Sequence, residues 1–226
     1  MSKPRHELKF FINVSDYFAI KNRIKHIASI DKNANSSGTY SIRSLYFDNF
    51  NDKALLEKIN GYSKREKFRI RYYNDNFDFI RLEKKSKVNG LCTKFSAALT
   101  KEQCEKILNN DIDWMLTSDK SLIQELYFKM KSQMLKPKTV VDYTREAYIY
   151  RPGNVRITID SNVKTGICSQ DMFNTALPTM KIPNNDTIIL EVKFDEFLPD
   201  IIKDTIQTNT RKSTSISKYA SSRMFG

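Results

Sequence analysis

Cysteine and histidine are scarce in this 226-residue chain, and their spacing excludes the common metal and redox motifs. The three cysteines, Cys92, Cys104 and Cys168, stand far apart and form no CxxC pair. His6 and His26 lack a second His or Cys at the spacing of zinc ligands. Sparse, odd-numbered thiols favour a reducing compartment and structural cysteines. We therefore expect neither a disulfide scaffold nor a zinc centre.

Long apolar runs are also missing from the sequence. A membrane helix needs about 20 consecutive apolar residues, and no segment approaches that length. The N-terminal stretch MSKPRHELKFFIN meets charged residues too early for a secretory signal peptide. Glycine and proline number only 6 each, and 40% of residues are hydrophobic, which excludes collagen and a disordered chain. We expect a soluble, cytoplasmic protein, with any membrane segment in a partner or a longer parent chain.

Negative charge is in deficit. Lys and Arg number 38 against 26 Asp and Glu, which leaves a net charge of +12 at pH 7. This excess indicates an anionic partner such as nucleic acid, nucleotide, polyphosphate or lipid headgroups. The length is ample for a sizeable core, and no repeat, low-complexity tract or linker divides the chain. The sequence therefore predicts a single domain over residues 1–226.

Alternation with a period of two predicts seven strands. They cover residues 5–12, 40–47, 67–73, 79–87, 139–150, 155–160 and 187–194. On strand after strand one face is apolar and the other is basic, with a few carboxylates. Lys67, Arg69 and Arg71, for example, share one face of their strand.

Apolar residues at helical spacing predict helices between these strands. The predicted helices are 15–28, 51–59, 100–109, 119–134, 199–207 and a final one from about 215. Ser15 is the predicted N-cap of the first, and Thr100 begins the third. The pattern is that of an α+β protein.

The repeated basic faces favour an anion-binding tunnel. Like charges two residues apart on a strand emerge on one side about 7 Å from each other and repel. On one strand this is ordinarily a solvated face, but its repetition suggests that a polyanion relieves the repulsion. A sheet closed with its charged face inward would form a basic tunnel, with helices covering its apolar outer face. Arg and Lys neutralise phosphate oxygens and carboxylates bind Mg²⁺ or Mn²⁺, so this tunnel would suit a phosphate chain with a divalent metal.

Eight segments together resemble a known family. They are RHELKF (5–10), YSIRSLYFDN (40–49), KFRIRYY (67–73), RLEKKSK (81–87), VVDYTREAY (140–148), VRITID (155–160), ILEVKFD (189–195) and SISKY (215–219). Each piece alone is weak. In this order, over nearly the whole chain, they resemble the VTC domain, within the triphosphate tunnel metalloenzymes.

The resemblance implies a closed antiparallel β-barrel of about eight strands that forms a basic tunnel, with helices packed outside. It implies a polyphosphate polymerase, which transfers the γ-phosphoryl group of ATP onto a growing inorganic polyphosphate chain and releases ADP. The implied cofactor is Mn²⁺ or Mg²⁺. The implied partners are ATP, triphosphate and polyphosphate, with no nucleic acid.

The resemblance also implies site residues, transferred motif by motif. The catalytic positions that grip phosphate are Lys9, Arg69, Arg71, Lys85, Arg145, Arg156 and Lys218. Further phosphate-binding positions are Lys94, Tyr143, Ser217 and, as an extra ligand, Arg43. Glu191 matches the metal-binding glutamate. Glu7 and Glu83 are candidates to add to the metal site or to orient basic neighbours.

Two positions depart from the family pattern. The wider superfamily opens with Glu-x-Glu-x-Lys, but the register here gives Arg5, Glu7 and Lys9. The loss of one carboxylate disfavours a two-metal hydrolase and fits a one-metal site. A lysine that the polymerases carry just before the Ser-Lys pair is Ser215 here, which leaves the efficiency of chain extension open.

Three other functions stay open from the sequence. A triphosphatase on inorganic triphosphate or nucleotides would need the same ligands, with water as the acceptor. A non-catalytic polyphosphate-binding module would keep the arginines without needing Glu191. A nucleic-acid binder would also explain the charge, but it should interleave exposed aromatic residues with basic ones for base stacking. Here the tyrosines mostly lie opposite the basic residues or in helices.

Overall fold

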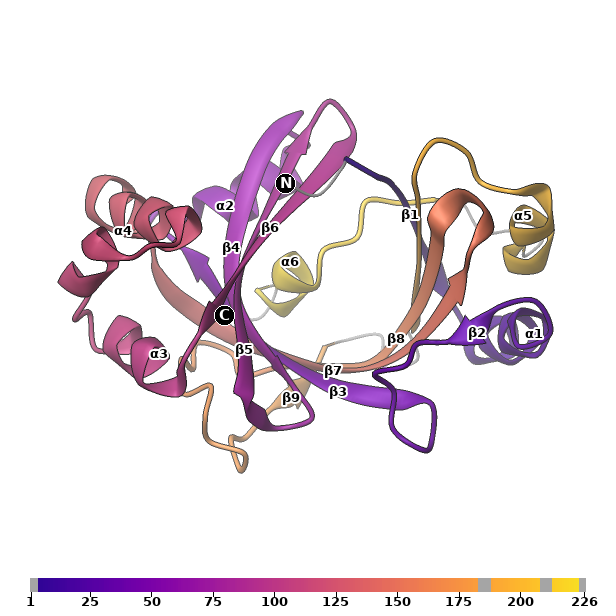
Figure 1. The fold of residues 1–226 in the computed structure, drawn as a ribbon, viewed down its shortest axis with the longest axis horizontal. Helices are drawn as coiled ribbons and strands as arrows, with labels where there is room; N and C mark the ends of the chain where they lie inside the picture. Colours follow the sequence, from indigo (N-terminus) through magenta and orange to yellow (C-terminus); the bar gives the residue numbers. More distant parts are fainter. Residues whose placement is uncertain (1–3, 183–187, 208–212, 224–226) are drawn as a thin grey trace.

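One antiparallel sheet of ten strands organises this computed structural model, which describes residues 4–182, 188–207 and 213–223 (Figure 1). The strands are β1 His6–Ile12, β2 Ser29–Ile30, β3 Thr39–Asp48, β4 Lys64–Tyr73, β5 Asn76–Val88, β6 Leu91–Leu99, β7 Lys136–Tyr150, β8 Val155–Thr165, β9 Met180–Lys181 and β10 Ile188–Phe194. Their order in the sheet is β1-β10-β8-β7-β3-β4-β5-β6, with β2 beside β7 and β9 beside β8.

The expected closed barrel is not confirmed. The edge strands β1 and β6 meet only at an isolated bridge, where Arg5 and Cys92 exchange backbone hydrogen bonds of 3.2 and 3.4 Å. No ladder joins the two strands within the described part of the chain. Beyond Cys92, β6 follows β5 and leads directly into α3, away from β1 (Figure 1). The structure is therefore α+β, with a large curved sheet that stays open.

Six α-helices accompany the sheet in the described residues. They are α1 Val14–Ile24, α2 Lys53–Ile59, α3 Lys101–Leu108, α4 Ser121–Gln133, α5 Asp200–Ile206 and α6 Lys218–Ser222, with short 3₁₀ turns η1 Asp113–Thr117 and η2 Pro152–Asn154. Figure 1 shows α3 and α4 at one end of the sheet, α1 and α5 at the other, and α6 within its curve. All six match predicted helices.

The predicted cap of the first helix was wrong. Asn13, not Ser15, caps α1: its side chain accepts a hydrogen bond of 2.8 Å from the Asp16 backbone N–H. The Asp16 side chain accepts one of 3.3 Å from the Asn13 N–H in return. This reciprocal capping box satisfies two backbone donors and so fixes the start of the helix two residues earlier.

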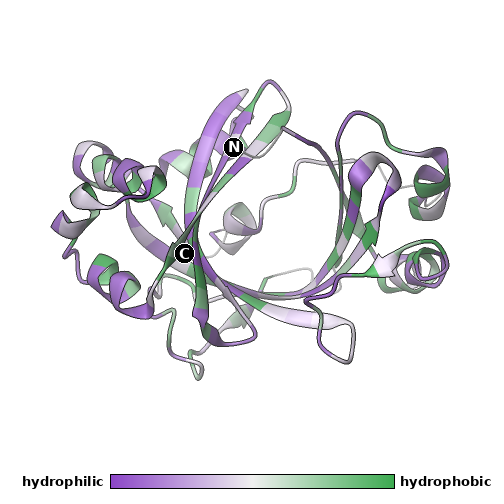
Figure 2. Ribbon diagram, in the orientation of Figure 1, coloured by the Kyte–Doolittle hydropathy of each residue, from purple (hydrophilic) through white to green (hydrophobic). Residues whose placement is uncertain are grey.

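The apolar faces of the strands point outward, as the alternation predicted, and form two cores beneath the helices. Phe68, Ile70 and Leu82 pack against α3 and α4. Ile157 and Leu190 belong to the core that holds α1 and α5. Figure 2 shows hydrophobic and hydrophilic segments following each other along the strands. On most strands the outer face therefore supports a helix and the inner face is charged, while a third apolar cluster, from β3, β7 and α6, lies on the inner side.

All seven predicted strands are present, but the sequence reading omitted β6 and the short β2 and β9. Residue 187, the predicted start of the last strand, lies outside the described residues. Of the described helices, none is long and apolar enough to cross a membrane.

Candidate functional site

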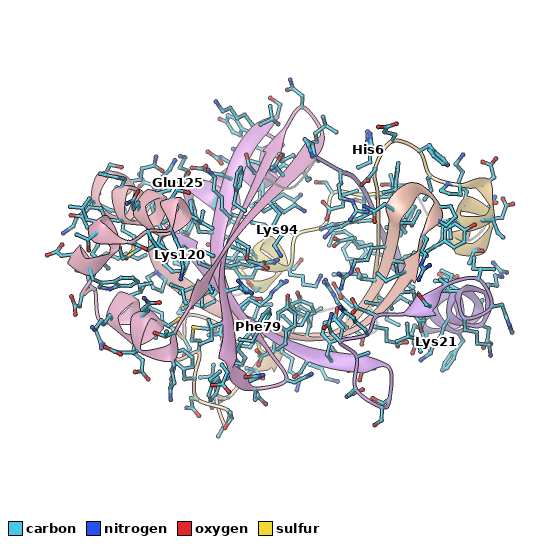
Figure 3. All side chains as sticks on the ribbon, viewed as in Figure 1. His6, Lys21, Phe79, Lys94, Lys120 and Glu125 are labelled. Carbon is cyan, nitrogen blue, oxygen red and sulfur yellow. The ribbon has the colours of Figure 1, made fainter. Side chains whose placement is uncertain are left out.

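A cavity of about 430 Å³ lies on the inner face of the sheet. This is many times the volume of about 10–15 Å³ that a single water requires, so the cavity has room for several linked phosphate groups. Cations from seven strands, from α6 and from the residue before β1 line it. They are Arg5, Lys9, Lys67, Arg69, Arg71, Lys85, Lys94, Arg145, Arg156, Lys193 and Lys218. Figure 3 shows Lys94 at the centre of the molecule near α6, whereas Lys21 and Lys120 lie toward the outer helices.

The structure brings together in one cavity all of the implied residues except Arg43 and Glu83, and Glu83 lies directly behind its wall. Glu7, Tyr143, Ser217 and Glu191 line the same cavity as the implied cations. Their shared position follows from strand geometry, because every second residue of a strand emerges on the same face. Arg43 alone lies on the opposite face of its strand and away from the cavity.

Arg43 points to the outer face of β3, which it shares with the core residues Leu45 and Phe47. Its guanidinium makes a bidentate pair with Asp142, with two contacts of 2.8 Å, and donates to the Asn174 carbonyl at 2.5 Å. Arg43 does not line the cavity and anchors the outer loop instead. Alternate residues of a strand face opposite sides of the sheet, and on β3 the inner positions belong to Ser44 and Tyr46.

Glu83 gathers three cations on one wall of the cavity. Its carboxylate lies 2.6 Å from Arg69 Nη2, 3.7 Å from Arg71 Nη1 and 2.5 Å from Lys94 Nζ. Burial alone would raise the pKa of this carboxyl, but the three cations outweigh it and hold the pKa well below its usual range. Glu83 therefore orients basic side chains, one of the two roles expected for it.

Asp160 does the same on the opposite part of the sheet and was missed by the sequence reading. It is fully buried and accepts a bidentate pair from Arg145, at 2.6 and 2.7 Å. Lys218 Nζ of α6 adds a contact of 2.5 Å. Burial opposes the charged form, yet Arg145 and Lys218 lower the pKa of Asp160 to about 2. Asp160 thereby fixes two cations whose other hydrogen-bond donors remain for a ligand.

Glu7 and Glu191 form a third acidic group, on the neighbouring strands β1 and β10. Lys9 lies between them, with Nζ 3.4 Å from Glu7 and 3.3 Å from Glu191. Lys85 contacts Glu7 at 2.5 Å, and Lys193 contacts Glu191 at 2.8 Å. Backbone register explains the group, because Lys9 pairs with Glu191 and Glu7 with Lys193.

Both carboxyls of this acidic group stay ionised. Burial and their mutual repulsion act to raise the pKa of Glu7, but Lys9 and Lys85 lower it below its usual value. The pKa of Glu191 is held well below its usual range: burial opposes this, and Lys193, Lys9 and Lys85 outweigh it. Two adjacent ionised carboxylates in a basic cavity provide hard oxygen ligands, which divalent cations prefer.

The Glu7–Glu191 pair fits a divalent metal with open coordination positions. Glu7 Oε1 is buried, lies 3.4 Å from Lys9 Nζ and accepts no hydrogen bond in the described structure, so it keeps lone pairs that a metal could use. No set of three His, Cys, Asp or Glu residues suitable for a metal occurs among the described residues. Phosphate oxygens would have to complete the coordination. This donor set suits Mg²⁺ or Mn²⁺ bound together with a phosphate chain.

Tyr143 and Ser217 bind neighbouring residues as well as lining the cavity. The Tyr143 hydroxyl accepts a hydrogen bond of 2.6 Å from Arg71, and Lys218 Nζ lies 4.7 Å from the centre of its ring. Ser217 Oγ caps α6 by accepting from the Ala220 N–H at 3.3 Å. It also accepts from Lys67 at the same distance. Both residues therefore position cations of the wall.

Several lining residues carried no role in the sequence reading. Lys67 precedes Arg69 on the same face of β4, and Lys193 follows Glu191 in the same way. Each lies two residues from an assigned residue on the same strand, and this spacing alone would have placed both side chains in the cavity. Tyr46 was not predictable as a lining residue, because an aromatic side chain between Leu45 and Phe47 reads as part of the core. Arg69 donates to its hydroxyl at 3.1 Å.

The fold is thus that of an α+β protein that turns a basic sheet face inward, with carboxylates paired among the cations of its cavity. The model of one family, the VTC domain, matches residues 4–225. The chain belongs to the VTC domain family. The expected family assignment is thereby confirmed over nearly the whole length.

Solved structures with low sequence identity also resemble this chain. The PH1012 protein of Pyrococcus horikoshii shares 15% identity, with 89% of this chain and 85% of that chain covered and a TM-score of 0.44. A Pyrococcus furiosus conserved hypothetical protein shares 12%, with 89% and 85% covered and a TM-score of 0.44. A Bacillus halodurans protein described as a "putative adenylate cyclase" shares 13%, with 84% and 80% covered and a TM-score of 0.47. No curated protein matches the chain.

Proposed function

We propose that the chain is a polyphosphate polymerase, which transfers the γ-phosphoryl group of ATP onto a growing inorganic polyphosphate chain within the basic cavity. The proposal treats residues 1–226 as one functional unit. The observation that carries it is the convergence of eleven lining cations with two ionised carboxylates, Glu7 and Glu191, in a chain of the VTC domain family. A single phosphate would not need so many cations.

Phosphoryl transfer asks the protein chiefly for positioning and charge stabilisation. Arg69, Arg71 and Arg145 are each fixed by a carboxylate or tyrosine behind them, so their remaining N–H groups can bind non-bridging phosphate oxygens. Arg156, held by Asp31 at 2.6 Å, would do the same. Pre-positioned donors lose little freedom when the ligand binds, which favours the crowded, highly charged transition state.

Lysines would act as point charges along the phosphate chain. Lys9, Lys85 and Lys218 line the cavity, and Lys94 reaches it from β6. Glu7 and Glu191 would hold Mn²⁺ or Mg²⁺, which would neutralise charge on neighbouring phosphates when bound. The attacking group is a terminal phosphate oxygen of the acceptor chain, which is already anionic. The protein therefore needs no general base to activate the attacking oxygen.

The first test follows all products of ATP together. Purified protein is incubated with ATP and Mn²⁺, and ADP, orthophosphate and acid-stable polymer are measured in parallel. Arg71→Met and Glu191→Gln are the test variants, and Arg23→Gln and Glu102→Gln are matched controls on outer helices. We expect polymer and ADP without matching orthophosphate from the wild type and both controls, and neither product from the test variants.

Other results would replace the proposal. Orthophosphate without polymer would indicate a triphosphatase. Tight triphosphate binding without turnover would indicate a binding module. If Arg71→Met and Glu191→Gln both make polymer normally, the assigned site is wrong.

A further inference from the structure

A side pocket opens next to the large cavity, between α2 and the β4–β5 hairpin. It has a volume of about 40 Å³, room for about three waters and so for one phosphate group. The two spaces share Lys67, Lys85 and Ser217 in their walls. A linear ligand can therefore extend from one into the other past these three residues.

Lys67 differs from the other cations of the large cavity. Each of the others lies within 4 Å of a carboxylate, whereas Lys67 has none among the described residues. Its hydrogen bond goes to the neutral Ser217 hydroxyl, at 3.3 Å. A half-buried ammonium without a counter-charge is unfavourable in the empty protein, and an anion beside it would relieve the cost.

Three further cations of the side pocket share this feature. Lys58, Arg65 and Lys87 form no ion pair in the described structure. Lys58 donates to the Ser215 carbonyl and hydroxyl, at 2.6 and 2.8 Å, and Arg65 donates to the Tyr62 carbonyl. Burial, with Arg65, Lys9 and Lys87 nearby, lowers the pKa of Lys58.

The pocket's single carboxylate does not offset this charge. Glu66 is engaged by Lys84, at 3.3 Å, and by Lys129. Because those two lysines stand outside the pocket and occupy Glu66, this carboxylate pairs with none of the cations that line the pocket.

We propose that Lys58, Arg65, Lys67 and Lys87 form a second phosphate subsite, which binds groups of a linear polyphosphate that extend beyond the large cavity. The inference rests on the proposed function and adds a direction to it: the chain leaves the cavity between α2 and the β4–β5 hairpin. The subsite gives the protein a preference for chain length. Triphosphate fits within the large cavity and gains nothing from it, whereas a longer chain reaches both.

The test compares two ligands in metal-free buffer, tripolyphosphate and a long-chain polyphosphate, by isothermal titration calorimetry. The test variant is Lys58→Gln/Lys87→Gln, since neither lysine lines the large cavity. The control, Lys101→Gln/Lys106→Gln, removes the same charge from α3 on the outer side. Each lost charge-assisted hydrogen bond weakens binding by about tenfold. We expect the test variant to bind the long chain at least about tenfold more weakly, with tripolyphosphate affinity and the control unchanged.

Three results would overturn the subsite. The long chain could bind the test variant as tightly as the wild type, the control could lose as much affinity, or tripolyphosphate could weaken in parallel. If the double variant does not fold, Lys87→Gln alone serves, because the Lys87 side chain makes no hydrogen bond in the described structure. The proposed function fails separately: wild-type protein that binds neither ligand would refute the phosphate site itself, whereas normal polymer synthesis without chain-length preference would refute only the subsite.

Discussion

Two buried acidic regions in this protein use their oxygens differently. Asp160 commits both of its oxygens to Arg145 and Lys218, at 2.5 to 2.7 Å. Glu7 and Glu191 stand together on adjacent strands, share Lys9 at 3.3 to 3.4 Å, and leave Glu7 Oε1 without a hydrogen bond. The first arrangement holds cations in place. The second leaves one carboxylate oxygen, Glu7 Oε1, with lone pairs for another ligand.

The difference distinguishes carboxylates that stabilise the folded protein from carboxylates that can bind a ligand. A saturated carboxylate stabilises the wall, and its loss leaves buried cations unpaired. An unsaturated pair is held by the fold at some cost and gains when a cation binds. Substitutions at Asp160 should therefore act mainly on stability, and substitutions at Glu191 mainly on metal-dependent activity.

The largest expected effect is on stability, from Asp160→Asn. The change leaves Arg145 and Lys218 buried without their counter-charge, which costs about 3–5 kcal/mol of the free energy of unfolding. Urea unfolding of the two proteins at neutral pH measures it. A loss below about 1 kcal/mol would place Asp160 among ordinary surface ion pairs and remove the contrast.

Glu191→Gln should affect activity more than stability. Removing one preorganised charge from a catalytic centre lowers the rate by about 10²–10³-fold. Stability should fall less than in Asp160→Asn, because Lys9 keeps Glu7 as a partner and Lys193 is partly exposed. ATP turnover with Mn²⁺ and urea unfolding, measured on the same preparation, give the two quantities. Equal activity in Glu191→Gln and the outer control Glu102→Gln would contradict the assignment.

The contrast also predicts a pH dependence. The pKa of Asp160 is about 2 in the folded protein against an ordinary 3.8, so its contribution is present above pH 3.8 and is lost as the pH falls toward 2. The lost stability is about 2 kcal/mol. Unfolding measured from neutral pH downward should show the gap between wild type and Asp160→Asn narrowing in this window. A gap that stays constant to the lowest accessible pH would contradict the assigned shift.

The smallest effect on function is expected at Arg43. This arginine makes the same bidentate pair as Arg145, but on the outer face of the sheet. Arg43→Lys should cost about 1 kcal/mol of stability and leave the affinity for tripolyphosphate within about twofold. Arg145→Lys should weaken that affinity about tenfold or more. Calorimetric titration of both variants decides, and equal losses would erase the distinction between the two faces.

Most of the fold could be predicted because each strand carries two unlike faces. The alternation of Arg69 and Arg71 with Phe68, Ile70 and Tyr72 identifies both the strand and its inner side. Closure of the sheet could not be predicted, since it depends on long-range register between β1 and β6, which contact each other only around Arg5 and Cys92. β6 was missed because its alternation is weakened by small and polar residues in LCTKFSAAL.

The candidate site also has a part that the sequence predicts, the residues that face inward, and a part that it does not, their ion-pair partners. The alternation of side chains along a strand alone places Lys9, Arg71 and Glu191 inside. The same alternation in β3 places Arg43 outside. The partners could not be read from sequence, because Asp160 meets Arg145 through the register of the neighbouring strands β7 and β8, and Lys218 lies 58 residues away in the chain. How many cations contact each carboxylate depends on the tertiary structure and not on local sequence.

The most direct test of the central claim is whether a metal at Glu7 and Glu191 strengthens phosphate-chain binding. Tripolyphosphate is titrated calorimetrically into wild type, Glu191→Gln and Glu102→Gln, once as its Mn²⁺ complex and once metal-free with chelator. We expect wild type and Glu102→Gln to bind the Mn²⁺ complex more tightly than the metal-free chain, and Glu191→Gln to bind both alike. Wild-type affinity that is the same with and without Mn²⁺ would contradict the account.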